Sequence, residues 1–229
     1  MLCKLMRLIK TSAIFISLFM TNWSAQAVEQ FELKNSVGKP MLVERYGNGP
    51  TAVILAHQRD GSLEDWQFYA QELEELGHSA YVFDFNGHGK KKGFSKKLNT
   101  QHKDIALILE YVRNTAPSKI YLLGSSMGAA SVIKASEAEK LNGTIALAPY
   151  ANLSSKWTSS STKSYKKITN PVLLVSTKGD SSAKHAKTLN NSIAQSELIM
   201  YGGKAHGIEI FETPDGDDLR QRIEQFLQN

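Results

Sequence analysis

Hydrophobic residues form short continuous runs along the chain, and between these runs they recur at the spacing of helices. The runs 52–56 and 120–123 are apolar throughout, which is typical of strands buried on both faces of a sheet. Trp66, Tyr69 and Leu73 repeat at intervals of three and four residues, which indicates an amphipathic helix. The pattern predicts strands at 31–33, 41–46, 52–56, 81–83, 120–123, 144–148, 172–175 and 198–201. It predicts helices near 66–76, 105–112, 129–135, 182–194 and 216–227.

These elements alternate in a regular order. The first two strands form an antiparallel pair joined through residues 38–40, and from 52 onward strands and helices alternate. Such alternation predicts an α/β fold, with one mostly parallel central sheet of about eight strands and helices on both faces. Ligands bind such sheets at the carboxyl ends of the strands. Polar residues that directly follow a strand are therefore the first candidates for a functional site.

The first 27 residues have the composition of a cleaved secretory signal. Three basic residues precede the apolar segment 13–20, and Ala25-Gln26-Ala27 has the small-x-small pattern of a cleavage site. An uncleaved membrane anchor is the alternative, but the apolar segment is too short to span a bilayer comfortably. We therefore expect a signal peptide at 1–27, one domain at 28–229, and export to the periplasm or the exterior.

Removing this leader changes the charge balance and the cysteine content. The chain has 27 Lys and Arg against 22 Asp and Glu, and three of the basic residues lie in the leader, so the remainder carries a net charge of +2. That near-balance does not indicate a nucleic-acid partner. The only cysteine, Cys3, also lies in the leader. The domain therefore offers no thiol nucleophile and no Cys-based zinc site, and the sequence implies no metal or cofactor.

The pentapeptide Gly124-Ser125-Ser126-Met127-Gly128 carries the strongest chemical signal. It lies between the predicted strand 120–123 and the predicted helix 129–135. A strand, Gly-x-Ser-x-Gly and a helix together form a nucleophile elbow, in which the glycines allow strand and helix to pack closely and leave the serine exposed. The free N–H groups of the helix N-terminus can bind an oxyanion. Ser126 is the candidate nucleophile.

Asp180 and His206 are the candidate partners of Ser126, because each follows another predicted strand. Either residue alone is more typical of an ordinary turn or loop. Together they supply the two functions that a serine nucleophile needs. His206 can accept the hydroxyl proton near neutral pH, and Asp180 can orient the imidazole and stabilise its charged form.

After the leader, the chain resembles the α/β-hydrolases over nearly its whole length. The order Ser, Asp, His along the chain is theirs. Residues 56–66 resemble their His-Gly-x-x-Gly-Ser…Trp segment, and residues 84–89 resemble their Asp-x-Arg-Gly-His-Gly turn. The resemblance implies an α/β-hydrolase fold with Ser126, Asp180 and His206 as its catalytic triad.

The same resemblance implies where an oxyanion would bind. One donor is the backbone N–H of Met127, and the other is that of Arg59, with Gln58 as the alternative. Gln58 stands where the family usually has glycine. If that glycine has a positive φ in relatives, either Gln58 is strained or the loop takes a different shape.

Three other polar residues follow strands in these segments. We expect His57 and His88 to organise loops through local hydrogen bonds rather than to act as acid–base groups. Asp84 competes with Asp180 for the acid role, but it precedes Ser126 in the chain, which breaks the family order.

The segment 149–171 between two predicted strands contains few apolar residues. It cannot form an amphipathic lid, so we expect no cap domain and an open, shallow site. Tyr150 and Trp157 are candidates to line that site, although Trp157 can equally anchor its own loop. Lysines gather in the loops expected at the site end: Lys90, Lys91, Lys92, Lys96, Lys97, Lys156, Lys163, Lys166, Lys167, Lys178 and Lys204. They form either a positive rim that attracts anionic substrates or an ordinary solvated surface.

These features predict a serine hydrolase that cleaves small or medium acyl esters through an acyl-enzyme. A thioesterase or a peptidase would use the same triad, and a non-catalytic binding protein with this fold is the alternative from another class. A serine at the elbow disfavours haloalkane dehalogenases and epoxide hydrolases, which use an aspartate there. The sequence leaves the natural substrate and the oligomeric state open.

The leader generates the first testable prediction. Protein recovered from its source should begin at Val28, because cleavage follows Ala27. N-terminal sequencing of the native protein measures this directly. Recovery of chains that begin at Met1 from a cytosolic fraction would contradict export.

Overall fold

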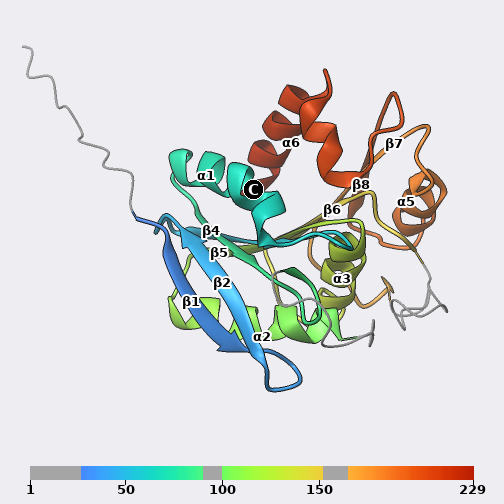
Figure 1. Cartoon of the computed structure of the whole chain (residues 1–229). Coiled ribbons are helices and arrows are strands. Elements are labelled where there is room, and N and C mark those ends of the chain that lie inside the picture. Colours follow the sequence, from blue (N-terminus) through green and yellow to red (C-terminus); the bar gives the residue numbers. More distant parts are fainter. Residues whose placement is uncertain (1–26, 90–99, 152–164) are drawn as a thin grey trace, which may run out of the picture.

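The computed structural model describes residues 27–89, 100–151 and 165–229. One sheet of eight strands forms its centre, in the order β1-β2-β4-β3-β5-β6-β7-β8 (Figure 1). The pairings of β2 with β1 and with β4 are antiparallel, and the remaining pairings are parallel. The strands are β1 (Glu29–Lys34), β2 (Pro40–Tyr46), β3 (Thr51–Ala56), β4 (Ser79–Phe83), β5 (Lys119–Ser125), β6 (Gly143–Leu147), β7 (Val172–Thr177) and β8 (Ser196–Tyr201). The predicted mostly parallel sheet is therefore confirmed.

Helices cover both faces of the sheet. The α-helices are α1 (Gln67–Glu75), α2 (Gln101–Asn114), α3 (Met127–Ala135), α5 (Ala183–Asn190) and α6 (Gly216–Gln228). Two short 3₁₀ helices are η1 (Leu63–Trp66) and η3 (Gly207–Glu212). Buried residues of α1 and α6 share one core cluster, whereas those of α2, α3 and α5 pack on the opposite face. Figure 1 shows α1 and α6 above the sheet and α2 below it.

Strand β3 shows why the apolar runs are continuous. Val53 and Leu55 enter the core shared with α1 and α6, whereas Ala52, Ile54 and Ala56 enter the core shared with α2 and α3. Successive side chains of a strand point to opposite faces, so a strand covered on both sides must be apolar at every position.

The predicted elements differ from the structure mainly at their ends. The helix predicted to reach 194 ends at Asn190, yet Ile193 is still buried in the core from the following turn. The apolar spacing therefore continued beyond the helix itself. Helix η3 was not predicted, because its six residues are too few to show a clear period.

The parallel strands β5, β7 and β8 end at the same edge of the sheet. Ser126 follows β5, Asp180 follows the end of β7 by three residues, and His206 follows β8 by five. Only 24 residues lie between the end of β6 and the start of β7, which leaves no room for a cap domain. No helix in the described ranges is both long and apolar enough to cross a membrane.

Candidate active site

Ser126 stands at a sharp turn between β5 and α3. Its backbone has φ 53° and ψ −108°, a conformation that is strained for any residue with a side chain. Its N–H donates to the carbonyl oxygen of Leu147 at 2.9 Å, which ties the turn to β6. The first N–H groups of α3 have no acceptor within the helix. The turn therefore has the backbone shape of a nucleophile elbow.

The glycines on either side of Ser126 are required by close packing. A Cβ atom on Gly124 would lie 2.4 Å from the carbonyl carbon of Gly128. A Cβ atom on Gly128 would lie 2.1 Å from the carbonyl oxygen of Ala56, at the end of β3. Both distances are far below van der Waals contact and involve backbone atoms, so α3 can sit this close to the sheet only with glycine at these positions.

Asp180 and His206 are in direct contact. The imidazole Nδ1 of His206 lies 2.9 Å from Oδ2 of Asp180. A carboxylate can only accept, so Nδ1 carries the proton and Nε2 is left as the acceptor. The Asp180 side chain is only 8% exposed, whereas that of His206 is 28% exposed and accessible from solvent. The pair thus presents a basic nitrogen of defined tautomer at the sheet edge.

The carboxylate of Asp180 is kept ionised by its neighbours. Burial alone would raise its pKa, but hydrogen bonds from Ser182 and His206 outweigh burial and hold the pKa below its usual range. The Ser182 hydroxyl donates to Oδ2 of Asp180, and the Ser181 hydroxyl approaches Oδ1 at 3.4 Å. A charged Asp180 can stabilise a positively charged His206.

The two loops that carry this pair are tied together. The N–H of Gly179 donates to the carbonyl oxygen of Gly203 at 2.8 Å, and the Thr177 hydroxyl donates to that of Ala205 at 2.9 Å. Glu209, in η3, accepts the backbone N–H of His206 at 2.9 Å. These hydrogen bonds fix the backbone that leads into His206.

His57 organises the loop after β3, as predicted. It is completely buried, its Nδ1–H donates to the carbonyl oxygen of Gln58 at 2.6 Å, and its Nε2 accepts the N–H of Phe85 at 3.1 Å. Burial lowers the pKa of His57 to about 4, so the ring is neutral at physiological pH. Asp84 also supports this region, because its Oδ1 accepts the N–H of Leu63 at the start of η1.

The loop after β3 does not strain its glutamine. Gln58 does not have a positive φ; the left-handed residue is Asp60, with φ 64°. Aspartate tolerates this conformation better than most residues. The structure therefore excludes a strained Gln58.

Tyr150 lies beside the Asp180–His206 pair. Its hydroxyl is 2.7 Å from the Ser181 hydroxyl, and its ring centroid is 6.2 Å from that of His206. Trp157 lies outside the described residues, as do the loop lysines at 90–92, 96, 97, 156 and 163. Lys166, Lys167, Lys178 and Lys204 are described and are exposed.

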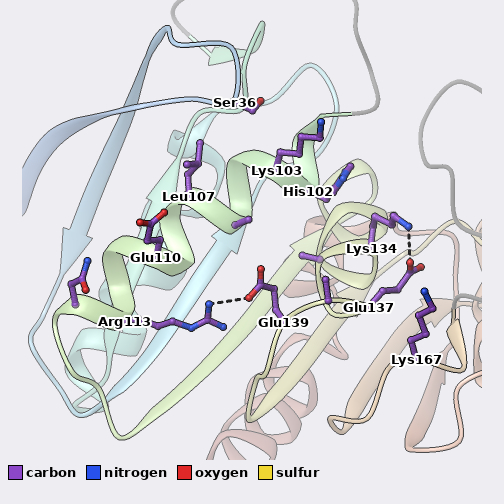
Figure 2. A pocket seen from close by; sticks show the side chains of 14 residues that line it. Ser36, His102, Lys103, Leu107, Glu110, Arg113, Lys134, Glu137, Glu139 and Lys167 are labelled. Carbon is purple, nitrogen blue, oxygen red and sulfur yellow. Dashed lines mark hydrogen bonds and ion pairs between the residues drawn. The ribbon is translucent and has the colours of Figure 1, made fainter.

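Lys167 lines a groove of about 830 Å³ that runs between α2 and α3. Figure 2 shows its mixed charge, with ion pairs between Lys134 and Glu137 and between Arg113 and Glu139. None of the three candidate catalytic residues lines this groove. The groove gives no support to a lysine rim at the site, which stays a prediction.

Three residues near the site were not found from the sequence: Ser125, Ser182 and Glu209. Serines are common in loops and glutamates on helices, so no local pattern distinguishes them. Within the described residues, no group of three or more His, Cys, Asp or Glu side chains is placed to hold a metal ion.

Comparisons with known proteins identify the family and the fold. Residues 49–192, which are more than half of the chain, match the family described as serine aminopeptidase, S33. The chain belongs to this α/β-hydrolase family. A curated relative, protein phosphatase methylesterase 1 from Bos taurus, is 27% identical over 118 residues, which cover 48% of this chain and 31% of that protein. The chain thus spans about a third of the length of that relative.

Solved structures of the same fold include esterases. The Pyrococcus furiosus esterase Pf2001 matches with a TM-score of 0.74 at 16% identity, over 88% of this chain and 92% of that one. XC6422 from Xanthomonas campestris, described as an α/β serine hydrolase without lid, matches with a TM-score of 0.69 at 20% identity, over 88% and 94%. At such identities the likeness shows the fold, and it agrees with a hydrolase that has no cap domain.

The packing at Gly128 gives a prediction about stability. Gly128→Ala should lower the free energy of unfolding by at least about 2 kcal/mol, because backbone atoms cannot yield to the new methyl group. Gly202→Ala is the matched control, since nothing lies within 4 Å of a Cβ there and the change should be small. Urea unfolding measures both. Equal stability of the two variants would contradict the close approach of α3 and β3.

Buried His57 gives a prediction about pH. The unfolded state binds this proton near pH 6.5 and the folded state only near pH 4, so the unfolded state holds more protons between those values. The stability of the fold should therefore decrease as pH falls through this window, by up to about 3 kcal/mol from His57.

His57→Gln should flatten this part of the stability curve measured by urea unfolding between pH 7 and pH 4. His185→Gln, at a partly exposed histidine, is the control and should leave most of the slope. An unchanged slope in His57→Gln would show that His57 does not titrate as described.

Proposed function

We propose that the protein is a serine hydrolase that cleaves small or medium acyl esters through an acyl-enzyme. The hydrogen bond of 2.9 Å between His206 and Asp180 carries the proposal, because it leaves Nε2 of His206 as a free base. Ser126 follows β5, which ends at the same edge of the sheet. The close contact between the His206 loop and β5 supports it, since the N–H of Ile208 donates to the Ser125 hydroxyl next to Ser126.

The residues would act in a defined order. Nε2 of His206 removes the hydroxyl proton of Ser126 as the oxygen attacks the acyl carbon. The negative oxygen that develops would be bound by the N–H of Met127 and by that of Arg59, or of Gln58. His206 then gives the proton to the leaving alcohol, and a water molecule repeats the sequence to release the acid. Asp180 holds the imidazole in the required tautomer throughout.

The acyl ester is favoured as substrate by two observations. The segment between β6 and β7 has no room for a cap, so the site is accessible to soluble esters. The names of the relatives given above are those of an esterase and a methylesterase, which indicate ester substrates, whereas the family is named for an aminopeptidase. Peptide and thioester substrates are therefore the alternatives to be tested beside esters. A positive rim of loop lysines would extend the range to anionic esters.

The leader places this activity outside the cytoplasm in our proposal. A core without disulfides suits such a location only if packing alone stabilises the domain. The two-sided burial of the sheet supplies that packing.

The nucleophile can be tested with a single substitution. Ser126→Ala should abolish labelling by a fluorophosphonate probe and lower kcat on p-nitrophenyl acyl esters by about 10³-fold or more, because no other residue supplies the attacking oxygen. Ser192→Ala, at a serine bonded within its own turn, should keep both activities. Wild-type protein that is never labelled would instead indicate a binding protein.

The same assay distinguishes the substrate classes. We expect p-nitrophenyl esters of increasing chain length to be cleaved with a higher kcat/KM than amino-acid p-nitroanilides or acyl thioesters. A preference for the anilides would show a peptidase, and a preference for the thioesters would show a thioesterase.

A further inference from the structure

Ser125, directly before the candidate nucleophile, joins two loops of the site. It is completely buried at the end of β5. Its hydroxyl oxygen accepts the N–H of Ile208 at 3.1 Å, and the hydroxyl donates to Oε1 of Gln58, also at 3.1 Å. Ile208 lies two residues after His206, and Gln58 lies in the loop after β3. A single buried hydroxyl therefore connects the loop of the base with the loop expected to bind the oxyanion.

The chemistry of the three groups fixes which one donates and which one accepts in each hydrogen bond. A backbone N–H can only donate, so the Ser125 oxygen is the acceptor for Ile208. The hydroxyl proton then needs an acceptor of its own, which Oε1 of Gln58 provides. Removal of this hydroxyl would leave the partly buried Ile208 N–H and Gln58 oxygen without this partner, which is unfavourable.

The backbone beside His206 packs directly against this hydroxyl. Gly207 has φ 59°, and a Cβ atom there would lie 2.1 Å from the Ser125 oxygen and 3.5 Å from Oε1 of Gln58. The residue that follows the base therefore lies directly against the Ser125 hydroxyl, with no room for a side chain. Little space remains for the His206 loop to move independently of Ser125.

Gln58 passes this restraint to the oxyanion loop. Its carbonyl oxygen accepts the N–H of Gly61 at 3.2 Å and the Nδ1–H of His57 at 2.6 Å. Its side chain holds Ser125 while its backbone organises the turn that contains Arg59. A glycine at position 58 has no side chain and could not make this bridge.

We propose that Ser125 is a positioning residue of the hydrolase. Its hydroxyl fixes the position of the His206 loop relative to the oxyanion loop through its hydrogen bonds with Ile208 and Gln58. This inference rests on the proposed function of Ser126, Asp180 and His206. It assigns a role to the glutamine that replaces the usual glycine of the family. Ser125 itself does not touch the substrate.

The kinetic test compares Ser125→Ala, Gln58→Met and the double variant. Gln58→Met keeps the length of the side chain and the backbone N–H but removes the acceptor. Loss of this relative positioning of the two loops should lower kcat about 10- to 100-fold with little change in KM, because displaced catalytic groups stabilise the transition state less well. Since both substitutions break the same hydrogen bond, the double variant should be no slower than Ser125→Ala alone.

Ser136→Ala controls for the loss of a buried hydroxyl. Ser136 is also buried, and its hydroxyl bonds to the carbonyl oxygen of Val132 and to Thr144, away from the three catalytic candidates. It should lower stability while leaving kcat per probe-labelled site unchanged. If Ser125→Ala behaves in the same way, with normal kcat per labelled site, Ser125 is merely structural and the proposal is wrong.

A second measurement does not depend on activity. The Nδ1 proton of His206, bonded to Asp180, should give a downfield NMR signal that is assigned by its loss in His206→Gln. Ser125→Ala should shift or broaden this signal, and Ser136→Ala should not. An unmoved signal would overturn the proposal. Wild-type protein that neither hydrolyses esters nor reacts with the probe would overturn the proposed function alone, because the NMR comparison still reports on the bridge.

Discussion

The close approach of α3 to the end of β3 is the constraint on which the candidate site depends. Gly128 lies so near the carbonyl oxygen of Ala56 that one additional carbon atom does not fit. This contact brings the N-terminus of α3 to the edge of the sheet. The strained backbone of Ser126 is its consequence, since the chain must reverse within one residue to pass from β5 into the helix. Core packing on both faces of the sheet supplies the free energy that holds this turn.

Two histidines differ in what they can do chemically because they differ in burial. His57 is fully enclosed, both of its nitrogens bond to backbone groups, and its pKa is depressed to about 4. Its neutral ring can only link the two loops through hydrogen bonds. His206 has one nitrogen committed to Asp180 and part of its ring open to solvent. That combination leaves a nitrogen of fixed tautomer that can accept a proton and is accessible from solvent.

The loops at the site edge are held by a chain of polar contacts in addition to apolar packing, in which Ala205 and Ile208 contact the core. Glu209 accepts the N–H of His206, Ser182 donates to Asp180, and Ser125 links Ile208 with Gln58. Such networks specify geometry more sharply than apolar contacts, because each hydrogen bond has a preferred direction. Such hydrogen bonds can hold donor groups and a base within a fraction of an ångström of the geometry that a hydrolase site requires.

The sequence by itself determined the architecture and the three catalytic candidates. Apolar runs such as 52–56 indicate strands covered on both faces, and Gly124 and Gly128 around Ser126 indicate the elbow. Both patterns can be read within one short segment, although the contacts that require them, such as that of Gly128 with Ala56, are long-range. The ends of elements were less well predicted, as Ile193 shows, because core contacts can extend beyond a helix.

Only the tertiary structure decided how the loops are joined. The contacts of Ser125 with Gln58 and with Ile208 span 67 and 83 residues of sequence, and no local period records them. The absence of strain at Gln58 was likewise decided by the path of the whole loop, in which Asp60 takes the left-handed position. Secondary structure follows from spacing along the chain, whereas the fit of three loops around one hydroxyl depends on side chains that meet only after the sheet has formed.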